Sequence, residues 1–296
     1  MYTLLADDPI KTPIKASIDT PIKTPIDDLG RERQDDYAIS AEFYDILQAE
    51  RDEARVRRLY RGHVGSARLG VLDVGAGTGR VTLMSLTESR VAVHAVEPAR
   101  SMRSPLMTRL ASLPADLRMR VTVHPCTLDE AALHGVADVA VCHNTIACLH
   151  PAARRALWPA VAEALVPEGV LLIQLPPARL PLRETTYVFP AQRVGQHEYG
   201  GLMRSSADGN RIRTRFSYWV RGEGGMGEVL REHTETFWMW PASRGELIGE
   251  LGESGFAPLP EHTERTGHTE RTGHTDRAVL AVRLGPMGAF GAFRQR

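Results

Sequence analysis

The sequence carries no net charge, because 36 Lys and Arg residues balance 36 Asp and Glu residues in a chain of 296. A protein that attracts nucleic acid or an anionic membrane through its overall field needs an excess of positive charge. Long apolar runs are lacking too: Val170–Leu175 is among the longest, far short of the roughly 20 residues that cross a bilayer. We therefore expect no nucleic-acid partner and no membrane partner.

Cysteine is scarce, and the apolar core of a signal peptide is missing. The three cysteines, Cys126, Cys142 and Cys148, show no Cys-x-x-Cys spacing. The sequence therefore predicts neither a disulfide framework nor a zinc site. Residues 1–29 contain no apolar segment of the kind that a secretory signal requires. We expect a cytoplasmic protein with no bound metal.

Short repeats occur near both ends of the chain. In residues 1–30 the unit Thr-Pro-Ile recurs, and such frequent proline forbids a helix and weakens a strand. We predict a flexible tail there, with a docking motif as the alternative. Near the other end, the unit His262–Gly267 is copied at residues 268–273 and begins again at His274. Charged copies separated by glycine favour a surface loop, with a metal-binding tract as the alternative.

Between the repeats, short apolar runs alternate with segments of helical spacing. Strands are predicted at Gly70–Val74, Val91–Val96, Val121–His124, Ala137–Cys142 and Val170–Leu175. Helices are predicted at Thr78–Ser89, Ser101–Leu113, Asp129–Leu133 and Ala152–Leu165. Because parallel neighbours need crossover connections, this order predicts an α/β fold with an open, mostly parallel sheet and helices on both faces. Ligands of such sheets bind at the carboxyl ends of the strands.

The flanking segments divide the chain further. Within residues 31–66 we expect two amphipathic helices, followed by the sheet domain at residues 67–178. Alternating polar and apolar residues at 179–240 predict an inserted antiparallel β cap, with a turn at Gly222–Gly227. Residues 241–296 are expected to hold one helix, at Pro241–Gly255, and two last strands, at Phe256–Leu259 and Ala278–Leu284, around the histidine repeat.

A glycine-rich turn joins the first predicted strand to the first predicted helix. Its sequence, residues 71–80, is Val-Leu-Asp-Val-Gly-Ala-Gly-Thr-Gly-Arg. Gly75, Gly77 and Gly79 let the backbone turn sharply and let a ligand lie against it. Glu97 ends the second strand, where a carboxylate can accept hydrogen bonds from both hydroxyls of a ribose held over that turn. The alternative for Glu97 is a carboxylate that begins a helix.

The glycine spacing and the acidic segment together resemble one known family. Dinucleotide folds usually have Gly-x-Gly-x-x-Gly, whereas this chain has Gly-x-Gly-x-Gly followed by Glu97-Pro98-Ala99-Arg100-Ser101-Met102. This pattern resembles the class I S-adenosylmethionine-dependent methyltransferases, over roughly residues 35–175, and implies a Rossmann-like core. The resemblance implies that S-adenosylmethionine is the cofactor and S-adenosylhomocysteine the product. The residues expected at the cofactor are Tyr37, Tyr44, Asp73, Gly75, Ala76, Gly77, Gly79, Glu97, Pro98, Met102, Thr127, Leu128, His143 and Asn144.

Within that set the resemblance implies different roles. Asp73 and the glycine turn would border the methionine part, and Met102 would pack on the adenine. After the third strand most relatives have a Gly-Asp pair, but this chain has His-Pro-Cys-Thr-Leu-Asp at residues 124–129. Thr127 and Leu128 would then contact the adenine, while Asp129 serves as a helix start. Tyr37 and Tyr44 resemble the aromatic element that covers the cofactor, where a sulfonium near a ring gains about 0.5–2 kcal/mol; core packing is the equal alternative.

The loop after the fourth strand, residues 142–150, lies where the family brings the substrate to the methyl group. Methyl transfer from a sulfonium has an excellent leaving group, so positioning and desolvation can supply most of the acceleration. The candidate catalytic residues are His143, His150 and Tyr44. Either histidine is a candidate base for a proton that the acceptor loses, since the ordinary pKa of histidine is about 6.5. Packing or surface roles are the alternatives, and Asn144 either orients the substrate or caps a turn.

The predicted cap concentrates about half of the aromatic residues of the chain. Some must hold the cap on the sheet, and the rest would line a substrate pocket that excludes water. Similar inserted sheets occur in relatives that methylate amines of amino sugars, amino acids and natural-product peptides. We therefore expect methyl transfer to a nitrogen atom of a small molecule or short peptide in specialised metabolism, with an oxygen atom as the second choice. The alternatives are a non-catalytic or regulatory S-adenosylmethionine-binding protein and an NAD(P)-dependent oxidoreductase.

Overall fold

The computed structural model describes residues 37–222, 228–260 and 279–286. The chain divides into residues 1–34 and residues 35–296, and every described residue belongs to the second part. The two predicted repeats and most of the predicted turn at Gly222–Gly227 lie outside the described residues. Within the described ranges, no helix is both long enough and apolar enough to cross a membrane.

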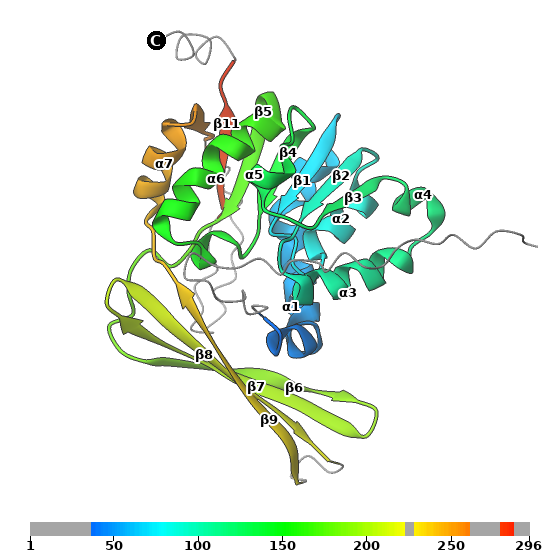
Figure 1. The fold of residues 1–296 in the computed structure, drawn as a ribbon, viewed down its shortest axis with the longest axis vertical. Coiled ribbons are helices and arrows are strands. Elements are labelled where there is room, and N and C mark those ends of the chain that lie inside the picture. Colours follow the sequence, from blue (N-terminus) through cyan, green and yellow to red (C-terminus); the bar gives the residue numbers. More distant parts are fainter. Residues whose placement is uncertain (1–36, 223–227, 261–278, 287–296) are drawn as a thin grey trace, which may run out of the picture. The chain divides into compact units, whose positions relative to one another are not determined.

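The larger sheet of the described residues has seven strands in the order β10-β11-β5-β4-β1-β2-β3 (Figure 1). In chain order they are β1 (Gly70–Val74), β2 (Ala92–Val96), β3 (Val121–His124), β4 (Ala137–Cys142), β5 (Leu165–Gln174), β10 (Phe256–Pro258) and β11 (Val279–Leu284). Strands β1 to β5 run parallel, and β11 lies antiparallel between β5 and β10. The expected open, mostly parallel sheet is confirmed. The strand order reverses between β1 and β4, which is where open α/β sheets bind ligands.

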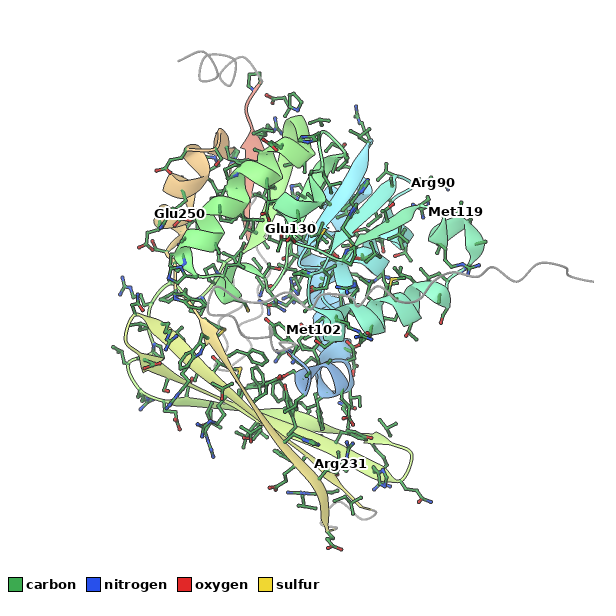
Figure 2. The ribbon with its side chains drawn as sticks, viewed as in Figure 1. Arg90, Met102, Met119, Glu130, Arg231 and Glu250 are labelled. Atoms are coloured by element: carbon green, nitrogen blue, oxygen red, sulfur yellow. The ribbon has the colours of Figure 1, made fainter. Side chains whose placement is uncertain are left out.

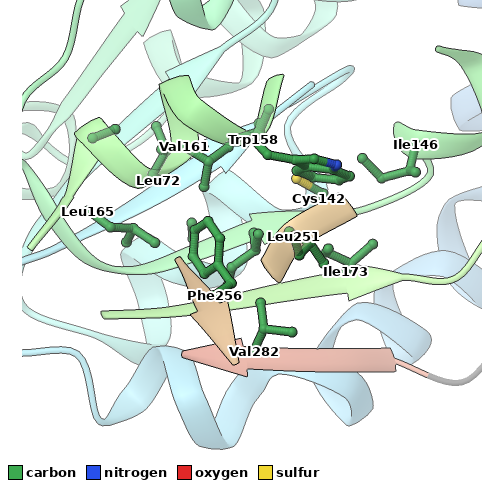
Figure 3. Close-up of a cluster of buried hydrophobic side chains, with 14 of the residues drawn as sticks. Leu72, Cys142, Ile146, Trp158, Val161, Leu165, Ile173, Leu251, Phe256 and Val282 are labelled. Carbon is green, nitrogen blue, oxygen red and sulfur yellow. The ribbon is translucent and has the colours of Figure 1, made fainter. Parts of the chain in front are cut away.

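Helices cover both faces of this sheet. The helices are α1 (Ser40–Gly65), α2 (Arg80–Glu88), α3 (Arg100–Ala111), α4 (Ala115–Arg118), α5 (Leu128–Ala131), α6 (Pro151–Ala164) and α7 (Arg244–Gly252), with a 3-10 turn η1 (Ile146–Cys148). Helices α1, α2 and α3 share one buried apolar cluster with the sheet, and α6 and α7 share the other. In the second cluster Trp158 of α6 is fully buried and packs with side chains of α7 and the strands (Figure 3).

The expectation of two helices in residues 31–66 is wrong, because α1 is one continuous helix of 26 residues. The apolar pattern is interrupted near its middle by Gln48, Glu50 and Asp52. Asp52 is nevertheless 1% exposed and faces Arg80 on α2 at 3.9 Å. A paired carboxylate therefore occupies a buried helix position that the sequence pattern assigns to an apolar residue.

The predicted cap is a separate antiparallel sheet of four strands, called here the cap sheet. Its strands are β6 (Thr185–Val194), β7 (His197–Asp208), β8 (Arg211–Arg221) and β9 (Val229–Met239), paired in chain order. One face packs on α1 through Phe43 and Leu47, which lie in a cluster with Phe189 and Tyr218. Beyond β9, the backbone N–H of Trp240 donates to the carbonyl of Ala147 at 2.8 Å. The end of the cap sheet is thus fixed to the loop that follows β4.

Candidate functional site

The glycine turn (Gly75–Gly79) lies at the carboxyl end of β1 beside the carboxyl end of β2. All three of its glycines have positive φ angles, 71°, 56° and 94° in chain order. A Cβ on Gly75 would lie 2.5 Å from Oγ1 of Thr145, and one on Gly79 would lie 2.4 Å from Leu106. At Gly77 a Cβ would meet nothing within 4 Å. Gly75 and Gly79 are therefore required for packing, while Gly77 leaves open space beside the backbone.

The structure brings Glu97 against this turn, as the sequence predicts. Its Oε2 accepts a hydrogen bond from the N–H of Gly77 at 2.7 Å, and its Oε1 accepts one from Ala99 at 2.8 Å. Glu97 is only 6% exposed, and burial raises its pKa, although the two backbone N–H groups oppose that rise. Each carboxylate oxygen retains a lone pair. The pair can accept hydrogen bonds from the hydroxyls of a ribose over Gly77.

Arg80, the residue after the glycine turn, joins the site to α1, which the sequence did not predict. Its Nη2 donates to Oδ1 of Asp45 at 2.9 Å, and that oxygen also accepts from Thr78 at 2.8 Å. Arg109 of α3 completes the cluster, with its Nη2 at 2.6 Å from the other oxygen of Asp45. Asp45 directly follows Tyr44 in the sequence, so the signal was there, but its partner lies 35 residues away.

The guanidinium of Arg80 is incompletely paired despite its burial. Arg80 is 6% exposed, and its Nη1 has no hydrogen-bond partner among the described residues. Its Cζ lies 5.2 Å from the ring centroid of Tyr44. A buried cation with a free donor is costly unless an anionic group joins it. The Nε of Arg80 also lacks a hydrogen-bond partner among those residues, and both Nη1 and Nε are buried from solvent.

Tyr44 and Asn144 connect α1 with the loop after β4. The hydroxyl of Tyr44 donates to Asp52 at 3.3 Å and accepts from Nδ2 of Asn144 at 3.4 Å. Burial raises the pKa of Tyr44, so its hydroxyl stays protonated. Asn144 adopts a left-handed φ of 56° and its N–H donates to the side chain of Gln174 at 3.0 Å. Gln174 therefore fixes the turn that presents both His143 and Asn144.

His143 lies at this turn, but it is a poor base. It is 8% exposed, and burial together with the charges of Arg55 and Arg80 lowers its pKa to about 3. Its Nδ1 lies 3.0 Å from the hydroxyl of Tyr60, which has no other hydrogen-bond partner within the described ranges. Its Nε2 lies 3.4 Å from Nδ2 of Asn144, so both ring nitrogens face a hydrogen-bond partner in either tautomer. His143 therefore has no unpaired basic nitrogen for a substrate.

His150 has a structural task at the start of α6. Its Nδ1 accepts a hydrogen bond from the N–H of Ala152 at 3.2 Å, which caps the helix. Its ring lies edge-on to Trp240, with centroids 5.5 Å apart. The nitrogen that a base would use is thus occupied in His150 as well. Neither histidine has a free acceptor nitrogen in the neutral ring.

Other expected cofactor residues take positions of two kinds. Met102 is buried on the first turn of α3 (Figure 2), outside the apolar clusters of the sheet faces, and Pro98 is exposed beside it. Thr127 forms a capping box with Glu130 at the start of α5, and Asp129 lies in that first helical turn. The remaining residues are turned inward: Ala76, Asp73 and Leu128 are 8%, 1% and 4% exposed. Asp73 accepts a 2.6 Å hydrogen bond from Thr82, which joins the end of β1 to α2.

The cap sheet uses most of its inward aromatic side chains to pack on α1. Those in that cluster are Tyr187, Phe189, Tyr199, Phe216 and Tyr218. Phe237 instead stacks on Tyr37 with centroids 4.6 Å apart, and Trp240 lies against His150. Tyr37 has a left-handed φ of 74°. These two pairs are the aromatic groups of the cap that remain for a substrate near the carboxyl ends of the strands.

Part of this chain matches a known protein family. Residues 72–171, which contain the glycine turn, Glu97 and the loop after β4, match the family described as a methyltransferase domain. No curated protein matches the chain.

Solved structures share the fold over most of the chain. One is an amino pentose methyltransferase of calicheamicin biosynthesis from Micromonospora echinaspora, CalS10, with bound S-adenosylmethionine, at 20% identity and a TM-score of 0.58; the match covers 82% of this chain and 95% of that one. DesVI from Streptomyces venezuelae matches at 17% identity and a TM-score of 0.62, covering 84% and 97%. The sugar N-methyltransferase KedS8 from Streptoalloteichus matches at 21% identity and a TM-score of 0.57, covering 84% and 93%.

Proposed function

The chain contains a methyltransferase domain on the class I S-adenosylmethionine-dependent fold, and from this premise we propose that it methylates a nitrogen atom of a small metabolite or short natural-product peptide. The methyl donor is S-adenosylmethionine, and S-adenosylhomocysteine is the product. The observation that carries the proposal is the open space at left-handed Gly77, bounded by the carboxylate of Glu97. The shared fold of an amino pentose methyltransferase of calicheamicin biosynthesis and of a sugar N-methyltransferase supports the choice of substrate class.

The residues of this chain would divide the cofactor between them. Glu97 would accept hydrogen bonds from the ribose hydroxyls, and the backbone at Gly77 would lie against the cofactor. Met102 would pack on the adenine side, and the positive charge of Arg80 beside Tyr44 would attract the methionine carboxylate. When bound, the cofactor supplies a methyl group attached to a positively charged sulfur. The sulfur keeps the electron pair of the broken C–S bond while the acceptor forms its new bond to the methyl carbon.

The state of the two histidines favours nitrogen over oxygen as the acceptor. A hydroxyl acceptor needs a base to take its proton, whereas a neutral amine attacks with its own lone pair. His143 has a pKa of about 3 and its two ring nitrogens contact Tyr60 and Asn144, while the Nδ1 of His150 caps α6. This chain therefore positions and desolvates an amine that arrives neutral. The amide of Asn144, beside His143, would orient the acceptor.

Thermal-shift binding of the full chain tests the cofactor crevice. We expect S-adenosylmethionine and S-adenosylhomocysteine to raise the Tm by about 5–10 °C at 100 times Kd. The rise should be sharply reduced in Gly77→Val and Glu97→Ala. Gly195→Val is the matched control, because Gly195 has a similar φ of 60° and also has nothing within 4 Å of a Cβ. Unchanged stabilisation in both site variants would remove the proposed site.

Methyl transfer to matched acceptors tests the reaction. The enzyme is incubated with a labelled methyl donor and with pairs of acceptors. The two members of each pair share one carbon skeleton and carry either an amine or a hydroxyl at the same position. We expect label on the amine at least ten times faster than on the alcohol. Faster transfer to the alcohols would overturn the choice of nitrogen. Cofactor binding with no transfer to any acceptor would instead support the regulatory alternative.

A further inference from the structure

The cap sheet turns an arginine-rich face away from α1. Side chains alternate along its strands, so Ser205 and Thr214 are buried on the inner face while Arg204, Arg213 and Arg215 are exposed on the outer one. The inner face is the one that packs on α1. The arginine face therefore belongs neither to the cofactor crevice nor to the aromatic pairs near it.

The strand register brings these positive charges together. Arg204 on β7 lies directly opposite Arg215 on β8, and Ser206 lies opposite Arg213. Like charges directly opposite each other weaken a sheet. Within the described part of the chain, Arg204, Arg213 and Arg215 have no ion pair or hydrogen bond from their side chains. By contrast, Arg211 on the same strand pairs with Asp208 at 3.3 Å.

These side chains enclose a small polar cavity. Its volume is about 110 Å³, and it is lined by Glu184, Arg204, Ser206, Arg213 and Arg215. One water molecule takes up about 30 Å³ in the liquid, so the cavity has the volume of three or four water molecules. One tetrahedral oxyanion is about this size. Three arginines and one serine line it together with a single glutamate, which leaves an excess of two positive charges among the lining residues.

We propose that this arginine cavity binds a phosphoryl group, as free phosphate or as part of a phosphate ester. Guanidinium groups form two parallel hydrogen bonds to phosphate oxygens, and three arginines line this cavity together with Ser206. The anion relieves the repulsion between Arg204 and Arg215. The carboxylate of Glu184 at the same cavity disfavours a long polyanion such as a nucleic acid, and the chain as a whole has no charge excess to attract one. The cavity thus selects a compact ligand.

Calorimetric titration of the full chain with inorganic phosphate and with pyrophosphate tests the cavity, at a fixed ionic strength of about 0.15 M. We expect saturable binding at one site, tighter for pyrophosphate. Arg213→Gln and Arg215→Gln should each weaken it about tenfold, because each removes a charge-assisted donor. Glu184→Gln should tighten it about threefold or more, because it removes the only negative charge that lines the cavity.

Arg193→Gln is the control, since Arg193 lies on β6 opposite Glu198, near the other end of the cap sheet. It removes the same charge from the chain and should leave the affinity within about twofold. Absence of saturable binding to the parent chain would overturn the proposal. Equal weakening by the control, or no tightening in Glu184→Gln, would show a diffuse charge effect and would overturn it as well.

Discussion

The hydroxyl of Tyr60 on α1 lies 3.0 Å from Nδ1 of His143 at the end of β4, and both side chains are buried. This contact occupies one ring nitrogen of His143, and Nδ2 of Asn144 lies 3.4 Å from the other. A second hydrogen bond, from Asn144 to the hydroxyl of Tyr44 at 3.4 Å, joins the same helix and loop. The helix over the glycine turn and the acceptor loop are therefore held together by two hydrogen bonds.

The pH dependence of methyl transfer should follow the acceptor and not His143. With a pKa of about 3, His143 stays neutral from pH 5 to pH 9 and cannot produce an inflection there. We expect kcat/KM to rise with pH and level off above the pKa of the acceptor amine, because only the neutral amine reacts. The measurement is kcat/KM from pH 5 to pH 9 with two acceptors of different amine pKa. An inflection near pH 6–7 that is the same for both acceptors and is lost in His143→Gln would contradict this.

Asp73 should make the protein less stable as the pH rises through neutrality. Burial raises its pKa to about 7, against the lowering effect of the hydrogen bond from Thr82. The folded state then binds a proton that the unfolded state, in which the carboxyl has its ordinary pKa of 3.8, has already lost. This stability is complete below the unfolded pKa of 3.8, falls by about 1.4 kcal/mol for each pH unit between that value and the folded pKa of about 7, and levels off above it.

Urea unfolding at pH 6 and pH 8 measures this effect in Asp73→Asn. The amide keeps an oxygen for the hydroxyl of Thr82 and cannot ionise, so the variant should lose about 1 kcal/mol less than the parent between the two pH values. Asp116→Asn serves as the control, because Asp116 is exposed on α4. If Asp73→Asn and the parent lose the same stability, Asp73 is already ionised at pH 6.

Local sequence predicted the sheet well and the contacts between its parts poorly. Strands β1, β3 and β4 have the predicted bounds, because short buried runs bounded by turn residues carry their own signal. The continuity of α1 was missed, since Asp52 interrupts the apolar pattern and its partner Arg80 lies 28 residues further along the chain. Charge pairs of this kind form only after the chain folds back on itself.

In the candidate site too, residues that belong to a local motif were predicted, whereas contacts between distant segments were not. Gly77 and Glu97 were found because one motif and one strand end place them, and the structure joins them by a hydrogen bond of 2.7 Å. The suppressed basicity of His143 was not predictable, because it depends on burial and on the charges of Arg55 and Arg80, which lie on other elements. The free donor of Arg80 was hidden for the same reason, since Asp45 and Tyr44 reach it from another helix.

Glu235 should link the cap sheet to cofactor binding. Its Oε2 accepts from the N–H of Ser40 at 2.8 Å, at the beginning of α1, where backbone donors lack helical partners. Glu235→Ala should fray the first turn of α1 at a cost of about 1 kcal/mol, and Tyr44 and Asp45 lie in the next turn. We expect a rise of about fivefold in the Kd for S-adenosylhomocysteine, measured by calorimetry.

Glu232→Ala is the matched control, since Glu232 is an exposed glutamate on the same strand opposite Trp219. It should leave the Kd unchanged. A Glu235→Ala protein that loses thermal stability yet binds the ligand as tightly as the parent would show that the link serves the fold alone.

Glu250 should account for a pH-dependent part of the stability through α6 and α7. Its carboxylate accepts two hydrogen bonds from Arg154, at 2.7 and 2.9 Å, and one from Nε1 of Trp158 at 3.2 Å. Burial alone would raise its pKa, but these hydrogen bonds and the arginine charges hold the pKa below its usual range. Arg154 is 3% exposed, so Glu250→Gln leaves a buried cation unneutralised. We expect a loss of about 2–4 kcal/mol in the free energy of unfolding at pH 7.

The pH dependence of that loss distinguishes the ion pair from simple packing. A carboxylate with a lowered folded-state pKa stabilises the protein above its unfolded pKa, and the contribution disappears as the pH falls through the folded value. The gap between the parent and Glu250→Gln should therefore be full at pH 7 and small near pH 3, as measured by urea unfolding. Arg155→Gln, which removes an exposed arginine 3.8 Å from the same carboxylate, should cost less than about 1 kcal/mol. A gap of equal size at both pH values would mean that shape, not charge, makes Glu250 necessary where α7 packs on α6.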